Sequence, residues 1–269
     1  MSSQGLTHVY LSPHLDDAAL SCGGLIHQQA QAGEPVVVIS LCAGFPPAGL
    51  LTPFAESLHA RWRTMAAEAV TARRAEDHAA LQTLGAAPVH LDLPDCIYRL
   101  DPQTGQALYA SEEALWGPVH AAEAGRVAEG AAAVADILHR VAAPRLYAPL
   151  ALGHHVDHQL TRQAGERLGR VWAYYEDYPY ADREANLSPN SIVTGQETVG
   201  LIAVLAPISE ADLAAQCRAV TAYASQISTF WGDANQIEPG LRAYAEHTGN
   251  RQLAERLWRP SPSTPHPPV

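Results

Sequence analysis

Two short segments hold a high density of side chains that bind metal ions. Residues 12–17 are Ser-Pro-His-Leu-Asp-Asp, and residues 153–158 are Gly-His-His-Val-Asp-His. A catalytic zinc takes three protein ligands from histidine and carboxylate groups and leaves a fourth position for water. The metal lowers the pKa of that water to about 7, and a carboxylate beside it can then take the proton. The two segments together contain enough groups for three ligands, a base and a supporting residue.

Each segment also has a purely structural interpretation. Asp16 or Asp17 can cap the helix that follows, and the later segment can be a polar loop with an aspartate at a helix N-terminus. Capping accounts for one aspartate of the first segment, but not for the adjacent histidine and the second aspartate. Two loops of this composition in one chain favour a shared metal site over two caps.

The separation between His14 and His158 excludes a local His-Glu-x-x-His site on one helix. Only a sheet can bring the two segments together. Short apolar runs predict buried strands, and these lie at 8–12, 35–42, 89–93, 145–150 and 171–176. Helices are predicted over 16–32, 61–84, 126–141 and from the loop at 151–156 to residue 169, and residues 44–58 are predicted to form a loop.

Continuous apolar strands that alternate with helices are typical of a Rossmann-like α/β fold, with a mostly parallel sheet and helices on both faces. The loops after the strands of such a sheet open on the same edge, where ligands bind. Residues 1–259 are therefore predicted to form a single domain, with an edge strand at 197–205 and a helix at 210–228. The segments 94–123 and 177–196 are expected to rim the pocket and to set specificity. The Pro-rich tail 260–269 is expected to be disordered.

Composition excludes several functions. All 17 basic residues are arginine, so a P-loop lysine and a Schiff-base lysine are both impossible. The net charge of −11, without a basic cluster, argues against nucleic acid and anionic membranes as partners. The sequence has no apolar run near the ~20 residues of a membrane span and no secretory signal pattern. The four cysteines form no Cys-x-x-Cys pair. A cytoplasmic location is expected.

The sequence resembles the PIG-L/LmbE-like deacetylases. A strand followed by Pro-His-x-Asp-Asp, a helix with Gly23-Gly24, and a much later His-x-Asp-His carry the resemblance. The resemblance implies that His14, Asp17 and His158 are the metal ligands, with Zn²⁺ as the metal and Fe²⁺ as the alternative in the cell. It further implies that Asp16 is the general base. His155 would steady the oxyanion or protonate the departing amine, and Asp157 would orient a neighbouring histidine.

Two further residues have both a functional and a structural interpretation. The family has an Arg-x-x-Glu motif before Leu-Gly, and the resemblance makes Arg73 a contact for substrate hydroxyls or a phosphate. The alternative is a solvated ion pair between Arg73 and Glu76. Asp95 follows the third strand and is either a sugar-hydroxyl acceptor or a turn cap. The sequence departs from the common pattern of the family at Leu15, Ala18 and Gly153, which leaves the metal ligands intact.

The resemblance implies hydrolysis of an N-acetylglucosamine-type substrate, a small molecule or glycoconjugate, by attack of metal-bound water on the acetyl carbonyl. Two alternatives remain open. His14-x-Asp16 with His158 formally matches the two-His-one-carboxylate site of non-haem iron oxygenases, although that site usually lies on an antiparallel β-barrel. A non-catalytic carbohydrate-binding relative is the other alternative. The sequence leaves open whether the chain forms a homo-oligomer.

Overall fold

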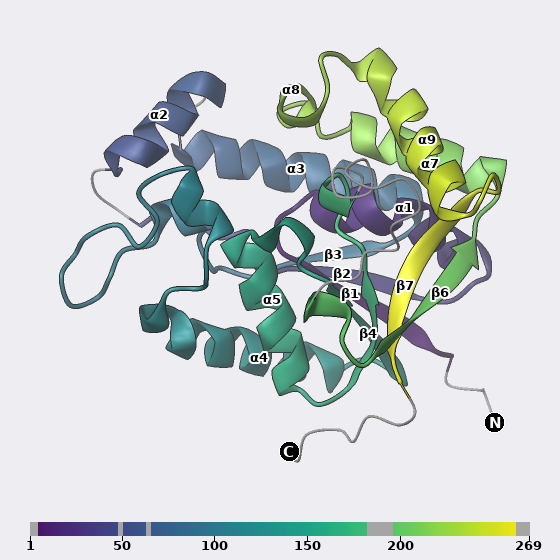
Figure 1. The fold of residues 1–269 in the computed structure, drawn as a ribbon, viewed down its shortest axis with the longest axis horizontal. Helices are drawn as coiled ribbons and strands as arrows, with labels where there is room; N and C mark the ends of the chain where they lie inside the picture. Colours follow the sequence, from purple (N-terminus) through teal and green to yellow (C-terminus); the bar gives the residue numbers. More distant parts are fainter. Residues whose placement is uncertain (1–4, 48–50, 63–65, 182–195, 262–269) are drawn as a thin grey trace.

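The computed structural model describes residues 5–47, 51–62, 66–181 and 196–261, which form an α/β domain around one sheet (Figure 1). The strands are β1 (Thr7–Ser12), β2 (Val36–Ser40), β3 (Ala87–His90), β4 (Pro144–Pro149), β5 (Val171–Tyr175), β6 (Leu201–Pro207) and β7 (Ala254–Pro260). Their order in the sheet is β3-β2-β1-β4-β5-β7-β6. The first five strands pair in parallel, whereas β7 pairs antiparallel with both β5 and β6. The predicted fold class is confirmed.

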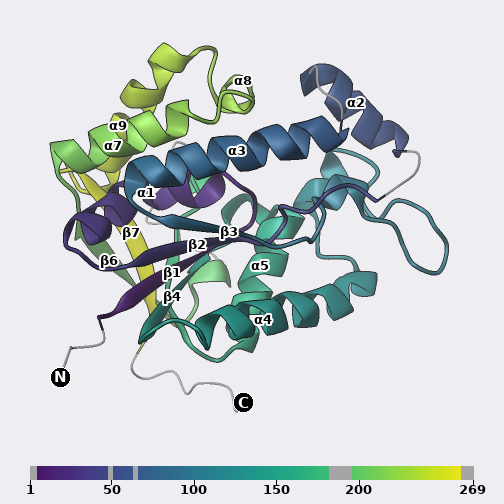
Figure 2. The ribbon, with the colours of Figure 1, turned by 180° about the vertical axis from the view of Figure 1, so that it is seen from behind.

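Helices cover both faces of the sheet. The longer helices are α1 (Asp17–Gln31), α2 (Pro53–Trp62), α3 (Ala66–Leu84), α4 (Ala124–Leu138), α5 (Val156–Arg167), α7 (Glu210–Thr221) and α9 (Ile237–Thr248), and α8 (Ile227–Phe230) is a single turn. Short 3₁₀ turns are η1 (Cys96–Tyr98), η2 (Glu113–Trp116), η3 (Ala121–Glu123), η4 (Leu152–His154), η5 (Gln196–Thr198) and η6 (Ala234–Gln236). Figure 2 shows α1, α3 and α7 on one side of the sheet and α4 and α5 on the other.

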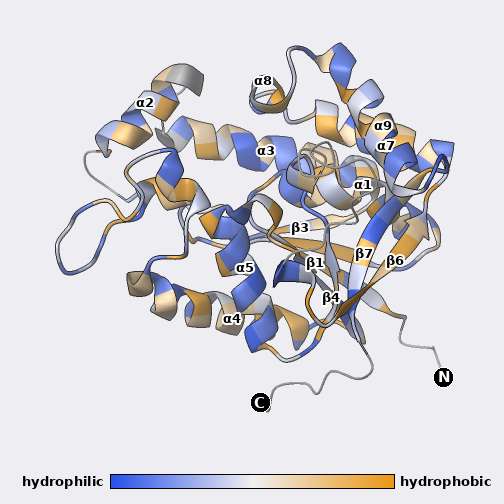
Figure 3. Cartoon of the chain, viewed as in Figure 1, coloured by the Kyte–Doolittle hydropathy of each residue, from blue (hydrophilic) through white to orange (hydrophobic). Residues whose placement is uncertain are grey.

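Strand β1 is buried along its whole length, which explains its continuous apolar sequence. Because successive side chains point to opposite faces, Val9 and Leu11 pack into the core beneath α4 and α5. Tyr10 packs into the core beneath α1, α3 and α7. Figure 3 shows the apolar residues gathered along the central strands. Because β1 is buried on both faces, the position of its carboxyl end, and of the turn that starts at residue 13, is fixed.

Three sequence predictions are corrected. Residues 44–58 do not all form a loop, because α2 begins at Pro53. In the helix predicted over 61–84, residues 61 and 62 belong to α2, and α3 begins at Ala66. Strand β7 was not predicted and extends into the first residue of the expected tail, Pro260. The charged residues Glu255 and Arg256 interrupt the apolar pattern that would have predicted a strand. Both side chains bind polar groups of other elements. Residues 262–269 of the tail lie outside the described residues.

Helix α1 is kinked at Cys22, whose backbone has φ −135° and ψ 15°. The kink turns backbone groups away from their helical partners, and two other elements satisfy them. The carboxylate of Glu255 accepts from the backbone N–H of Gly24 at 2.9 Å and of Leu25 at 3.0 Å. Burial of these groups without partners would cost about 1–3 kcal/mol each. Strand β7 thereby fixes the second half of α1.

The first half of α1 is held by α7. The side-chain amide of Gln216 donates to the carbonyls of Ala19 at 3.2 Å and Leu20 at 2.9 Å. A Cβ at Gly23 would lie 2.5 Å from Cγ of Gln216, so only glycine permits this approach. The two contacts anchor the turn of helix that directly follows Asp16 and Asp17.

The stability of the fold is expected to fall as the pH rises toward 8. Burial raises the pKa of Glu255 from 4.5 to about 8, even though two backbone amides lower it. Between these values the folded chain keeps a proton that the unfolded chain has lost, so raising the pH favours unfolding. Urea unfolding of Glu255→Gln across this range should show a weaker pH dependence than the wild type. The control Glu129→Gln, at an exposed position on α4, should keep the wild-type dependence. Equal dependence in all three proteins would contradict the assignment.

Candidate metal centre

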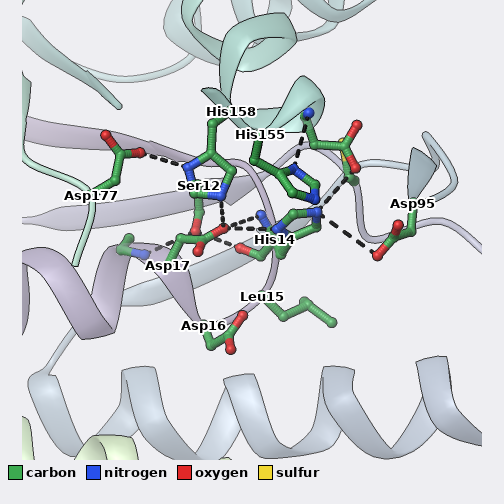
Figure 4. Close-up of polar contacts among 12 residues, drawn as sticks. Ser12, His14, Leu15, Asp16, Asp17, Asp95, His155, His158 and Asp177 are labelled. Atoms are coloured by element: carbon green, nitrogen blue, oxygen red, sulfur yellow. Dashed lines mark hydrogen bonds and ion pairs between the residues drawn. The ribbon is translucent and has the colours of Figure 1, made fainter. Parts of the chain in front are cut away.

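The polar side chains singled out from the sequence meet at the carboxyl edge of the sheet. His14 follows β1, His158 lies in the first turn of α5 after β4, and Asp177 follows β5 (Figure 4). Strands β1, β4 and β5 are neighbours in the sheet. The fold therefore brings together residues from three separate loops.

Local hydrogen bonds hold the turn between β1 and α1. The hydroxyl of Ser12 donates to the carbonyl of His14 at 2.5 Å and accepts from the backbone N–H of Ala18 at 3.0 Å. The carboxylate of Asp17 accepts from the backbone N–H of His14 at 2.8 Å. Asp16 is the N-cap residue of α1 but makes no side-chain capping bond, so the structural interpretation of Asp16 as a cap is wrong.

The turn between β4 and α5 contains an unusual backbone. Ala151, Gly153 and His154 all have positive φ, at 62°, 75° and 59°. Left-handed conformations at non-glycine residues are strained and cluster at functional sites. This turn presents His155 as the N-cap of α5, where its Nδ1 accepts from the backbone N–H of Asp157 at 3.3 Å.

The carboxylate of Asp17 lies between two imidazoles. Its Oδ2 is 3.1 Å from Nδ1 of His14 and 3.4 Å from Nε2 of His158. Burial would raise the pKa of Asp17, but His158 and His14 hold it well below its usual range. One carboxylate oxygen therefore contacts one nitrogen of each imidazole.

The remaining nitrogen of each imidazole is held by another carboxylate. Nδ1 of His158 lies 2.6 Å from Oδ1 of Asp177, and Nε2 of His14 lies 3.0 Å from Oδ2 of Asp157. Metal-binding histidines commonly donate their other ring N–H to a carboxylate, which fixes the ring and strengthens the ligand. The placement of Asp157 agrees with the expectation that it orients a neighbouring histidine.

Asp157 is itself part of a buried network. Its carboxylate accepts from the backbone N–H of Cys96 at 3.0 Å and forms an ion pair with Arg99. Arg99 also pairs with Glu123 at 3.0 Å. Burial raises the pKa of Asp157, yet Arg99 and the hydrogen-bonded His14 bring it well below its usual range. Asp157 therefore stays ionised.

The donor set fits a zinc ion. Nε2 of His158 is buried and has no hydrogen-bond partner among the described residues, as expected of an atom whose partner is a metal. His14, His155 and His158 have nitrogens within 4.8 Å of one another. A second grouping, Cys96 with His155 and Asp157, fits less well, because the backbone N–H of Cys96 and the side chain of Arg99 already occupy Asp157.

His155 is buried and neutral. Burial, with a smaller contribution from His14, lowers the pKa of His155 to about 3. Because its Nδ1 accepts a hydrogen bond from the backbone, the ring proton of the neutral form must be on Nε2. His155 is thus a hydrogen-bond donor at neutral pH.

Asp16 and Arg73 form a pair beside the cluster. Nη2 of Arg73 lies 3.3 Å from Oδ1 of Asp16, and no contact joins Arg73 to Glu76 among the hydrogen bonds and ion pairs of the described residues. Glu76 instead accepts from Ser225, so the structural alternative for Arg73 is wrong. Burial and the adjacent Asp17 raise the pKa of Asp16 despite Arg73. Raising the pKa of a carboxylate toward neutrality suits a general base.

Asp95 caps a turn, which was one of its two interpretations, and its other carboxylate oxygen faces the cluster. Its Oδ1 caps the η1 turn by accepting from the backbone N–H of Ile97 at 3.2 Å. Its Oδ2 lies 3.8 Å from Nε2 of His14. A small cavity beside the cluster is lined by Arg73, Asp95 and Tyr98. Both residues predicted to contact substrate therefore border one cavity.

Sequence reasoning missed the roles of Arg99 and Glu123 entirely. They lie in the irregular segment 94–123, where no periodic pattern marks a buried residue. Asp177 was placed only within the segment 177–196, which was expected to rim the pocket. Its position directly after β5, like that of His14 after β1, is the signal that could have identified it.

Comparisons with known proteins identify the family of the chain. Residues 9–168 match the family model of PIG-L, described as GlcNAc-PI de-N-acetylase. The chain belongs to the PIG-L family. It is similar to the 2'-N-acetylparomamine deacetylase of Streptomyces fradiae, with 30% identity over 94% of this chain and 89% of that protein.

Solved PIG-L relatives share the fold over nearly the whole chain. The zinc-inhibited form of a teicoplanin deacetylase superposes with a TM-score of 0.79 at 29% identity, covering 96% of this chain and all of that one. The A40926 pseudoaglycone deacetylase superposes with a TM-score of 0.71 at 27% identity, covering 95% and 96%. Within the described residues, the helices are too short or too polar to cross a membrane.

Replacing Asp177 by asparagine should weaken metal binding. The substitution removes the negatively charged carboxylate that contacts Nδ1 of His158. It keeps an oxygen that can accept from the backbone N–H of Leu152, which Asp177 also binds. Zinc affinity should fall roughly 10- to 100-fold, measured by competition with a chromogenic chelator. Asp136→Asn, at an exposed position on α4, is the control. Wild-type affinity in Asp177→Asn would show that this carboxylate does not support a ligand.

Proposed function

We propose that the protein is a zinc-dependent hydrolase that removes the acetyl group from an N-acetylglucosamine-type amino sugar. The observation that carries the proposal is the position of Asp17 between ring nitrogens of His14 and His158. The other nitrogen of each ring is held by a carboxylate. His14, Asp17 and His158 would hold the metal, which would supply a hydroxide near neutral pH and polarise the acetyl carbonyl.

Asp16 is proposed as the general base. It directly precedes the ligand Asp17, its carboxyl is buried, and Arg73 holds its Oδ1. A buried carboxylate with a raised pKa can take a proton from the attacking water and later release it. Arg73 then keeps the carboxylate oriented, in addition to bordering the substrate cavity.

His155 is proposed to stabilise the oxyanion that forms when the acetyl carbonyl is attacked. Its proton is on Nε2, and its Nδ1 is fixed by the backbone of α5. A preorganised donor of this kind is worth about 2.7–4 kcal/mol in known acyl-transfer sites. The C–N bond then breaks, the nitrogen gains a proton, and acetate and a free amine leave.

The substrate is proposed to be an amino sugar within a larger small-molecule glycoconjugate. Deacetylases of N-acetylparomamine, teicoplanin and the A40926 pseudoaglycone are similar to nearly the whole chain. Arg73 and Asp95 border the cavity beside the metal ligands and are proposed to bind sugar hydroxyls. Zinc is the proposed metal, with iron(II) as the alternative in the cell, and the cytoplasm is the proposed location.

Two observations count against the iron oxygenase alternative. That site requires the carboxylate of Asp16 beside both histidines, whereas the structure pairs Asp16 with Arg73. The fold is a mostly parallel α/β sheet rather than an antiparallel barrel. A non-catalytic carbohydrate-binding protein would not need the carboxylate-bound imidazoles of His14 and His158 or the buried carboxyl of Asp16. Hydrolysis therefore explains more of the structure.

Replacing Asp16 by asparagine should abolish most turnover and leave the metal bound. Loss of the base should lower kcat roughly 10²- to 10⁴-fold, with zinc content equal to that of the wild type. Turnover is measured as amine released from a panel of N-acetylglucosaminyl compounds, and the metal by elemental analysis. Asp92→Asn is the matched control, because Asp92 forms an exposed pair with Arg74, the neighbour of Arg73.

Different outcomes separate the parts of the proposal. Near-normal activity of Asp16→Asn would reject the base and leave the deacetylase intact. Loss of zinc from Asp16→Asn would make Asp16 a ligand. No amine release by zinc-loaded or iron-loaded wild type from any compound of the panel would reject the deacetylase itself.

A further inference from the structure

Trp116 is a large apolar side chain that stays exposed beside the proposed catalytic residues. It ends the η2 turn and is 37% exposed. Its ring centroid lies 5.2 Å from that of His155, at an interplanar angle of 79°. Tryptophan is highly buried on average, and its large apolar ring with a polar N–H makes it common at binding surfaces.

A second aromatic residue supports Trp116. The ring of Tyr180 lies 5.4 Å from the Trp116 ring and 5.5 Å from the His158 ring. We call His155, Trp116, Tyr180 and His158 the aromatic wall. Two of its members are the proposed oxyanion donor and a proposed metal ligand, so the wall borders the place where the acetyl group must react.

The wall depends on Gly153. A Cβ at this position would lie 2.9 Å from Cγ of Tyr180, and Gly153 has φ +75°. Any side chain there would therefore displace Tyr180 and remove the support of Trp116. The backbone of the metal-binding segment thus leaves space for an aromatic ring from the loop after β5.

The chemistry of sugars indicates what binds on this wall. A pyranose with only equatorial substituents presents two flat faces of C–H groups, and these pack on aromatic rings as other apolar surfaces do. The exposed part of Trp116 is therefore suited to the C–H face of a glucosamine-type ring.

We propose that Trp116 is the platform on which the pyranose ring of the substrate packs. This inference rests on the proposed deacetylase function and names a substrate-binding residue for the same site. Packing on Trp116 places the acetamido group beside His155, which is 5.2 Å away between ring centroids. Trp116 contributes binding and orientation and takes no part in proton transfer.

The test compares Trp116→Ala and Trp116→Phe with the wild type. The substrate is methyl N-acetyl-β-glucosaminide. Trp116→Ala should raise KM roughly 10- to 100-fold, with a much smaller change in kcat. Trp116→Phe should restore most of the affinity.

Fluorescence provides a readout that does not require turnover. Methyl β-glucosaminide, the deacetylated product, should quench the tryptophan emission of the wild type but not of Trp116→Phe. Trp172→Phe is the matched control, because Trp172 is also partly exposed but its ring lies against Arg145 and Arg259 at the start of β5. Quenching should persist in this control.

Three results would overturn the platform. They are an unchanged KM in Trp116→Ala, a loss of kcat at constant KM with wild-type zinc content, and quenching that persists in Trp116→Phe. The first and third show that the ring does not contact the sugar, and the second shows a structural effect on His155. Product quenching that requires Trp116, in an enzyme that hydrolyses no N-acetyl sugar, would reject the proposed function and keep the platform.

Discussion

The structure depends on one arrangement of charge, in which a buried carboxylate lies between two imidazoles. Asp17 faces one nitrogen of His14 and one of His158. Burial of this group is costly without compensation, and the surrounding structure supplies it. Asp157 and Asp177 hold the remaining nitrogens, and Arg99 neutralises Asp157. A cation at the centre would complete this balance, which explains why so many ionisable groups occupy one buried region.

The same arrangement explains features of the fold that lie outside the site. Helix α1 begins at Asp17, so any shift of the helix moves a proposed ligand. Its kink is held from both sides, by Gln216 of α7 and by Glu255 of β7. Strand β7 is antiparallel and comes late in the chain. Through its contact with α1 it contributes to the position of the turn that holds His14, Asp16 and Asp17.

Two segments that follow strands complete the surroundings of the histidine cluster. Arg99 and Glu123, from the segment between β3 and α4, complete the network under Asp157. Trp116 from the same segment and Tyr180 from the loop after β5 meet over His155 and His158. One segment thus provides both buried charge compensation and an exposed ring.

The fold class and the sheet edge at which the two histidine- and aspartate-rich segments meet were predictable from the sequence. Buried parallel strands have a continuous apolar pattern, and they place the loops that follow them on the same edge of the sheet. Resemblance added the distinction between Asp16 and Asp17. Tertiary structure alone decided that Arg73 binds Asp16 rather than Glu76, that Arg99 lies beneath Asp157, and that β7 completes the sheet. These contacts join residues that are far apart in the chain. The residues next to a charged side chain in the sequence do not reveal whether that side chain is solvated or forms an ion pair in the interior.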